Sequence, residues 1–275
     1  MVGSMQWTEE EIRYLRAILT WQANPDHKRA PPRLSSLATN EEQDSLTKRP
    51  VGNLRILVVG AEGCGKTSIL TRFCLDAFRG DVGAIGSSFD GSCRRLIEVD
   101  SQAYTADVLE LPGKHLAADT MLVNALNITE GAVLVYDVTD CASLALAARI
   151  QHYIKDAVGT REYGLLLVGN KSDVGEEAGR TVPAADGKMV AASFDMECGF
   201  MEASARTGEN VAAIFPTIGH EILRLRLLNR EQREEAELAA MLNLKAQTGA
   251  AIRNRRGIWK TITSPFSRRR STMPA

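Results

Sequence analysis

Short apolar runs and longer helical patterns alternate through the middle of the chain. Strands are predicted near residues 54–59, 94–99, 104–110, 132–137, 164–169 and 198–202. Helices are predicted near residues 66–79, 116–128, 141–157, 184–194 and 209–228. The runs at 132–136 and 165–168 are apolar throughout, as in strands covered on both faces, whereas those at 94–99 and 104–110 alternate and are expected to form a hairpin. The pattern predicts an α/β domain with a mostly parallel sheet, helices on both sides, and a ligand at the carboxyl ends of the strands.

The two ends of the chain differ from this middle part. Residues 1–51 are expected to form an N-terminal extension, because Thr8 and Glu11 make a capping box for a short amphipathic helix, and a polar linker follows. This helix has two alternative roles, covering the core of the protein itself or binding a partner. Residues 229–275 are expected to form a helical extension with a basic tail, which leaves residues 52–228 for the α/β domain.

The basic tail has two alternative interpretations. No acidic residue follows Glu237, and basic residues are interleaved with aromatic ones such as Trp259 and Phe266. A solvated, disordered tail is one interpretation. Peripheral contact with anionic lipid at the inner membrane surface is the other, because cations bind lipid headgroups and aromatic rings insert between them. The run of arginines at 268–270 before Ser271 also resembles a basophilic phosphorylation site, where added negative charge would weaken lipid binding.

The strand at 54–59 runs directly into a glycine-rich segment, Gly60-Ala-Glu-Gly-Cys-Gly-Lys-Thr67, that precedes a helix. Strand, G-x-x-x-x-G-K-T and helix in this order are typical of a phosphate-binding loop (P-loop, residues 60–67), in which backbone N–H groups and the helix N-terminus bind one anion. Lys66 is expected to reach the β- and γ-phosphates, and Thr67 to bind Mg²⁺. Nucleotide contacts are predicted for Gly60, Glu62, Gly63, Cys64, Gly65, Lys66, Thr67 and Ser68.

Composition and the lack of targeting motifs indicate a globular protein of the cytoplasm. The 275 residues are 44% hydrophobic and 24% charged with a net charge of -1, which is ordinary for a globular protein and indicates no nucleic-acid partner. No signal peptide, transmembrane helix or CaaX lipidation motif is recognisable, so a cytoplasmic protein is expected.

The five cysteines are odd in number, lack the spacing of a zinc site, and are expected to be reduced. Cys64 has two alternative interpretations. It is either a thiol whose pKa is lowered near the start of a helix, or an inert packed thiol covered by nucleotide, which we favour.

Two later segments are expected to select guanine over adenine. Asn170-Lys171-Ser172-Asp173 follows a buried strand, and the Asp173 carboxylate can accept two hydrogen bonds from guanine N1–H and N2–H₂, a donor pair that adenine lacks. Asn170 is expected to brace the loop and the Lys171 stem to lie across the ring. The next strand ends in Glu-Ala-Ser204-Ala205-Arg206, whose backbone N–H groups are expected to meet the guanine carbonyl.

On these residues the chain resembles the small GTPases of the Ras superfamily, Ras-like proteins above all, over residues 52–228. The resemblance implies a P-loop G domain with a six-stranded mixed sheet, one antiparallel edge pair and five flanking helices. It implies GTP or GDP with Mg²⁺ as ligands, and Phe78 packed against the guanine. It also implies effector proteins, an exchange factor and an activating protein as partners.

The segments that contact the γ-phosphate depart from the family. Its D-x-x-G motif appears as Glu110-Leu-Pro-Gly113, where Glu110 is expected to reach Mg²⁺ through water and Gly113 to offer an amide to the γ-phosphate. Lys114 replaces the glutamine that orients the attacking water, and a lysine has no acceptor for that water. Glu62 stands where Ras has glycine. The loop at 80–91 has no threonine, so Ser88, with Ser87 second, is the predicted Mg²⁺ ligand.

Lys66, Gly113 and Lys114 are therefore the candidate catalytic residues, and two functions stay open. One is a guanine-nucleotide switch with slow Mg²⁺-dependent GTP hydrolysis. The other is a nucleotide-bound pseudo-GTPase that acts as a scaffold without cycling. An ATP-driven enzyme is a third option, but Asp173 argues against it because its carboxylate is expected to pair with guanine rather than adenine.

Overall fold

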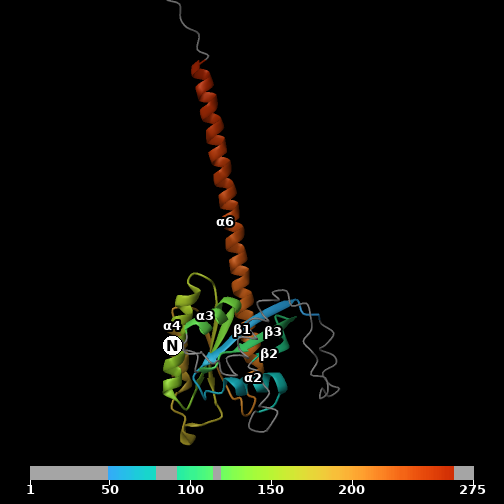
Figure 1. The fold of residues 1–275 in the computed structure, drawn as a ribbon, viewed down its shortest axis with the longest axis vertical. Coiled ribbons are helices and arrows are strands. Elements are labelled where there is room, and N and C mark those ends of the chain that lie inside the picture. Colours follow the sequence, from blue (N-terminus) through green and yellow to red (C-terminus); the bar gives the residue numbers. More distant parts are fainter. Residues whose placement is uncertain (1–48, 79–91, 114–118, 263–275) are drawn as a thin grey trace, which may run out of the picture. The chain divides into compact units, whose positions relative to one another are not determined.

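The computed structural model describes residues 49–78, 92–113 and 119–262 (Figure 1). The N-terminal helix predicted from Thr8, the loop at 80–91 and the residue Lys114 lie outside the described residues.

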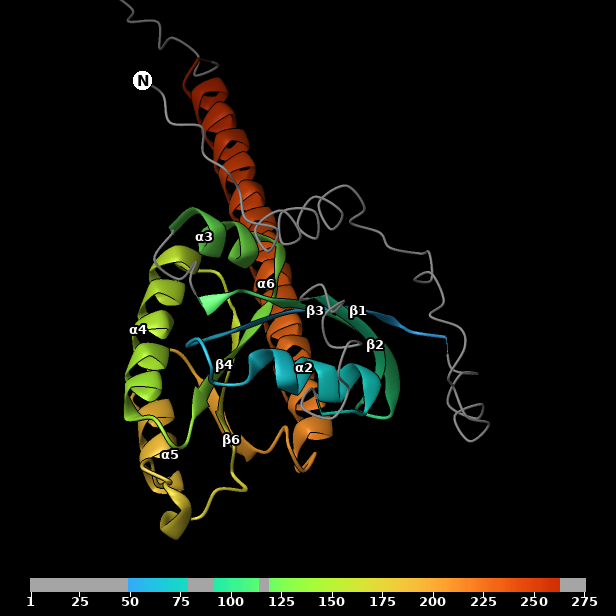
Figure 2. The same ribbon diagram turned by 60° about the horizontal axis from the view of Figure 1, so that its bottom comes forward.

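A six-stranded sheet forms the centre of the domain (Figure 2). Its strands are β1 (Gly52–Gly60), β2 (Ser92–Val99), β3 (Gln102–Glu110), β4 (Gly131–Asp137), β5 (Gly164–Asn170) and β6 (Cys198–Ala203). They lie in the order β2-β3-β1-β4-β5-β6, with β2 antiparallel to β3 and every other neighbouring pair parallel. The prediction of a mixed sheet with one antiparallel edge pair is confirmed.

Five α-helices accompany the sheet within the described residues. They are α2 (Lys66–Leu75), α3 (Asp119–Ile128), α4 (Cys141–Val158), α5 (Ala184–Ala192) and α6 (Val211–Ile262), with a short 3₁₀ turn at Glu176–Ala178. The prediction that the first helix reaches residue 79 is wrong, because Asp76 adopts a left-handed conformation with φ of 51° and closes the helix by donating its N–H to Arg72 O.

Alternate residues of β1 face opposite layers of the core. Leu54, Ile56 and Val58 belong to a buried cluster that also contains apolar side chains of α2 and α6. Leu57 and Val59 belong to a second buried cluster with side chains of α3, α4 and α5. Because successive side chains of a strand point to opposite faces, a continuous apolar run is what a sheet covered on both faces requires.

Helix α6 continues far beyond the predicted end near residue 228, to Ile262. The chain divides into two compact units, one up to Leu225 and one from Arg226 onward. The helical prediction for residues 230–245 is confirmed. Of the two interpretations of the basic tail, the disordered one is wrong for residues 246–262, which continue the helix. No helix in the described ranges is long and apolar enough to span a lipid bilayer.

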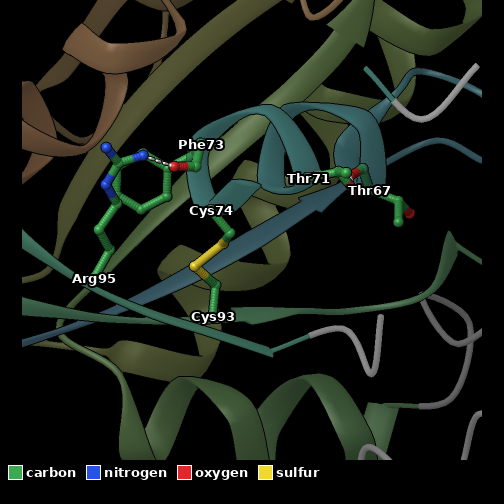
Figure 3. The surroundings of a disulfide bond; sticks show 6 residues. All are labelled: Thr67, Thr71, Phe73, Cys74, Cys93 and Arg95. Atoms are coloured by element: carbon green, nitrogen blue, oxygen red, sulfur yellow. Dashed lines mark hydrogen bonds between the residues drawn. A yellow bond between two sulfur atoms is a disulfide. The ribbon is translucent and has the colours of Figure 1, made fainter. Parts of the chain in front are cut away.

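A disulfide joins Cys74 in α2 to Cys93 in β2, with the Cα atoms 6.4 Å apart (Figure 3). Arg95 of β2 donates to Phe73 O and lies 5.4 Å from the centre of the Phe73 ring, which holds the end of α2 against β2 beside this pair. The expectation of five reduced cysteines is therefore wrong for two of them, whereas Cys64, Cys141 and Cys198 are free thiols.

Candidate functional site

The P-loop follows β1, and two of its glycines have no room for a side chain. A Cβ at Gly60 would lie 2.1 Å from Val135 O, and one at Gly65 would lie 2.2 Å from Asn170 Nδ2. Gly65 has φ of 91° and is the N-cap residue of α2, a backbone conformation that glycine adopts without strain. The glycines that the motif predicted are thus required by the close approach of the loop to β4 and to Asn170.

Lys66 is 5% exposed, and its ammonium lies over the P-loop. Lys66 Nζ donates to Gly60 O at 3.0 Å and to Ala61 O at 2.7 Å. An ammonium has three N–H donors, so one remains for an anion beyond these two described bonds. A buried cation beside the N-terminus of a helix favours a phosphate group at this position.

Thr67 and Glu110, two of the predicted Mg²⁺ ligands, lie together. Thr67 Oγ1 donates to Glu110 Oε1 at 2.6 Å, which joins the first turn of α2 to the end of β3. A hydroxyl and a carboxylate are hard oxygen ligands that fit Mg²⁺, which takes one or two protein ligands and completes its octahedron with phosphate and water. The described residues contain no group of three or more His, Cys, Asp or Glu suited to a metal. Ser87 and Ser88 lie outside the described residues.

The structure places Gly113 against the P-loop. A Cβ on Gly113 would lie 2.7 Å from Glu62 N, so this position also needs glycine. Glu62 and Gly63 are exposed, and Ser68 is half-buried. Phe78 is half-buried and packs against the core cluster that contains the α2 side chains.

Asn170 connects the phosphate side of the site to the base side. The side chain is 1% exposed, and its Nδ2 donates to Cys64 O at 2.8 Å. Its Oδ1 accepts the N–H of Ala205 at 3.1 Å. The bracing role predicted for Asn170 matches this geometry. The N–H of Ala205 was expected to donate to a guanine carbonyl, but in the structure it donates to Asn170 Oδ1.

Asp173 lies beside the segment that follows β6. Ser204 Oγ donates to Asp173 Oδ1 at 2.6 Å and accepts the N–H of Thr207 at 3.1 Å. The Arg206 guanidinium is 3.8 Å from Asp173 Oδ2. Because Ser204 is fully buried, its hydroxyl is a fixed donor that orients the Asp173 carboxylate.

Lys171 forms an ion pair with Asp137, a residue that the sequence motifs did not predict as part of the site. Its ammonium donates to Asp137 at the end of β4, and its backbone has φ of 68°. Burial raises the pKa of Asp137, but hydrogen bonds from Lys171 and Thr139 outweigh it and lower the pKa below the ordinary value of 3.8. Asp137 was interpreted only as part of a strand. Its position at the carboxyl end of a central strand was the signal that it could face the site.

Arg72 is a second residue that sequence reasoning missed. From α2 it donates through Nε to Ala205 O at 3.1 Å and through Nη2 to Arg206 O at 2.6 Å. It belongs to no motif, and only the fold brings it beside the segment after β6.

The thiol of Cys64 is 1% exposed in the P-loop. Burial raises the pKa of this thiol and outweighs the nearby Lys66 ammonium, which lowers it. The interpretation of Cys64 as an activated thiol is therefore wrong, and the packed-thiol interpretation fits the structure.

Comparison with known proteins gives a match to the Ras family over residues 55–224. Ras-like protein rasX of Dictyostelium discoideum is 30% identical over 162 residues, which cover 59% of this chain and 72% of that protein. Ras-related protein RAB1BV of Beta vulgaris is 30% identical, covering 71% of this chain and 87% of that protein. GTP-binding protein GEM of Mus musculus is 27% identical, covering 71% and 65%. Because the family match spans more than half of the chain, this protein belongs to the Ras family of small GTP-binding proteins.

Proposed function

We propose that this protein is a guanine-nucleotide-dependent signalling switch that hydrolyses GTP slowly. The link through Asn170 from Cys64 O in the P-loop to Ala205 N carries this proposal, because it sets the phosphate side and the base side next to each other. One nucleotide can then reach Lys66 with its phosphates and Asp173 with its base. The stem of Lys171 would lie across the ring, and Phe78 would pack against it as the family resemblance implies.

In this proposal, Thr67 and Glu110 hold Mg²⁺ together with phosphate oxygens. Mg²⁺ bound there would neutralise charge on the β- and γ-phosphates. Lys66 adds a fixed positive charge, and Gly113 approaches the P-loop closely enough to offer its amide on the γ-phosphate side. These groups favour tight binding of the phosphates, and they also supply the positioning and charge neutralisation on which phosphoryl transfer mostly depends.

Slow hydrolysis is proposed because the group that positions the attacking water is altered. Lys114 follows Gly113 directly and offers donors but no acceptor to that water. Glu62 adds an exposed negative side chain to the P-loop next to Gly113, where the phosphate charge would be greatest. Both changes disfavour an attacking water in line with the γ-phosphate.

The test is to identify the nucleotide that co-purifies and then to measure single-turnover hydrolysis of GTP with Mg²⁺. We expect GDP or GTP, and a rate constant on the order of 10⁻⁴ s⁻¹ or below. Glu62→Gly combined with Lys114→Gln should hydrolyse GTP faster than the wild type, and Lys114→Arg serves as the matched control that restores no acceptor. Unassisted hydrolysis at about 1 s⁻¹, the range of an activated GTPase, would contradict slow turnover.

A scaffold that stays loaded with nucleotide is the alternative, and the same two residues, Glu62 and Lys114, favour it. The two functions differ in whether the nucleotide state changes the protein surface. Hydrogen exchange in the GDP form and in a form loaded with a non-hydrolysable GTP analogue separates them. Equal protection of residues 80–91 and 114–118 in both forms would support the scaffold.

The proposed partners are effector proteins, an exchange factor and an activating protein, as in the family generally. A cytoplasmic protein with peripheral attachment to anionic lipid through the basic residues after Lys245 is also proposed. Sedimentation with anionic liposomes, comparing the full chain with one that ends at Lys245, tests this attachment. Equal sedimentation of the two chains would exclude a role for the tail.

A further inference from the structure

We propose that Arg72 is a positioning residue that fixes the base loop (residues 204–208) to the helix of the phosphate site, and so sets how slowly a guanine nucleotide dissociates. The inference rests on the proposed guanine-nucleotide binding. Arg72 itself contacts neither the P-loop nor Asp173 through any described hydrogen bond.

The guanidinium of Arg72 binds two successive carbonyls of the base loop. Nε donates to Ala205 O at 3.1 Å and Nη2 donates to Arg206 O at 2.6 Å. Nη1 donates to Asp76 O at 3.2 Å, at the end of the same helix. A planar fork with fixed N–H directions matches two neighbouring carbonyls in a way that an ammonium does not.

Both backbone polar groups of Ala205 are therefore hydrogen-bonded to side chains. Its N–H donates to Asn170 Oδ1, and its carbonyl accepts from Arg72 Nε. The loop also passes close to the arginine stem, because a Cβ on Gly208 would lie 3.7 Å from Arg72 Cδ. Next to this residue, Ser204 orients Asp173, the proposed guanine acceptor. Fixing Ala205 thus fixes the segment that carries the base contacts.

Helix α2 carries Lys66 and Thr67 in its first turn and Arg72 further along the same helix. Arg72 consequently ties the base loop to the element that positions the phosphate ligands. A nucleotide that engages both ends gains from this preorganisation, because the protein need not be ordered when it binds. A ligand that engages only the phosphate site gains nothing from it.

The test compares Arg72→Ala, Arg72→Lys and the control Arg161→Ala in the full chain. Arg161 also donates to a backbone carbonyl, Leu126 O at 2.6 Å, and lies 5.2 Å from the centre of the Tyr163 ring, so it makes a similar structural contact among residues of the other core cluster. The measurements are the dissociation rate of fluorescent GDP by stopped flow, the affinity for inorganic pyrophosphate with Mg²⁺ by calorimetry, and the melting temperature.

We expect Arg72→Ala to release GDP about tenfold faster, as loss of charged hydrogen bonds predicts, with an unchanged affinity for pyrophosphate. Arg72→Lys should lie between the wild type and Arg72→Ala, and Arg161→Ala should release GDP at the wild-type rate. If Arg72→Ala does not fold, Arg72→Lys and Arg72→Gln, which keep a hydrogen-bond donor on a shorter side chain, should still release GDP faster than the wild type.

The proposal is overturned by GDP release within about twofold of the wild type in every folded Arg72 variant. It is also overturned by a parallel loss of pyrophosphate affinity, or by an equal acceleration in Arg161→Ala, since both would show a general structural effect. A wild-type protein that binds pyrophosphate but no GDP would defeat the proposed function as well, which distinguishes the two failures.

Discussion

Asp137 shows how a residue outside the recognised motifs supports one inside them. It ends a central strand, accepts from Lys171 and also accepts from the N–H and the hydroxyl of Thr139. The lysine of the N-K-S-D element, whose backbone is left-handed, therefore has its ammonium fixed by Asp137. The same contacts make the charge of Asp137 part of the stability of the folded protein.

Asp137→Asn should lower the free energy of unfolding at pH 7 by about 1 kcal/mol, a charged hydrogen bond discounted for the partial exposure of Lys171. Because the pKa of Asp137 is lowered on folding, its contribution is present above the unfolded value of 3.8 and is lost as pH falls through the folded value. The difference between wild type and variant should therefore shrink below about pH 4. Urea unfolding across pH 3 to 7 measures it.

Asp140→Asn is the matched control for this experiment. Asp140 accepts the N–H of Ala142 as the N-cap of α4, and asparagine caps a helix equally well. A constant difference between wild type and Asp137→Asn from pH 3 to 7 would show that the charge of Asp137 plays no part.

The three free thiols should differ sharply in reactivity toward alkylating agents. The thiolate is the nucleophile, so a raised pKa slows the reaction, and burial keeps the reagent away from the sulfur. At pH 8, iodoacetamide should modify the exposed Cys141 first and leave Cys64 unmodified in the native protein. Burial raises the pKa of Cys64, and burial raises the pKa of Cys198 to about 12. Peptide mapping by mass spectrometry measures the labelling, and denatured protein, in which all three thiols should react, is the control. Labelling of native Cys64 as fast as Cys141 would refute this.

At the scale of elements, the junction of α2 and β2 is held by more than apolar packing. The Cys74–Cys93 disulfide and the Arg95 hydrogen bond to Phe73 O join one end of α2 to β2. At the same end, the Phe73 ring packs against Phe215 of α6, with the ring centres 3.9 Å apart. The other end of α2 begins the nucleotide site. Restraint of this helix at its far end therefore stabilises the element on which Lys66, Thr67 and Arg72 are carried.

Replacing both Cys74 and Cys93 by alanine should lower the free energy of unfolding by about 3 kcal/mol in the absence of reductant, the loop-closure entropy for a sequence separation of 19. Urea unfolding with and without dithiothreitol measures this loss, and in reductant the difference should largely vanish. Cys141→Ser is the control, because Cys141 is an exposed free thiol. Equal unfolding midpoints for wild type and double variant without reductant would contradict the prediction.

Element ends were less predictable than elements. The strands follow from apolar runs whose partners lie on both faces, so their positions could be predicted. The end of α2 depends on the left-handed backbone of Asp76, and the length of α6 on a charged segment whose pattern gave no stop signal after residue 228. The end of α2 and the length of α6 thus depend on backbone conformation and on charged residues, and not on the spacing of apolar residues from which helices were predicted.

For the molecule as a whole, the sequence predicted which chemistry meets at the site better than how it is held. Lys66, Thr67, Asn170 and Asp173 could be named because each occupies a fixed place in a motif next to a strand end. Arg72 could not, because its partners are distant in sequence and only the fold brings them close. Asp137 offered a signal in its place at a strand end, but its partner Lys171 is brought close only by the pairing of β4 with β5. The disulfide was missed for the same reason, since no local spacing indicates that α2 packs beside β2.

The central claim is that one ligand spans Lys66 and Asp173, with Asp173 choosing the base. The most direct test measures the dissociation constants of wild type and Asp173→Asn for GDP and for xanthosine diphosphate, with Mg²⁺ in both cases. We predict that the wild type prefers GDP by at least about 100-fold and that Asp173→Asn prefers xanthosine diphosphate, because an asparagine amide can donate to the xanthine carbonyl that replaces the guanine amino group. An unchanged preference in Asp173→Asn, or a wild type that binds neither nucleotide, would contradict the account.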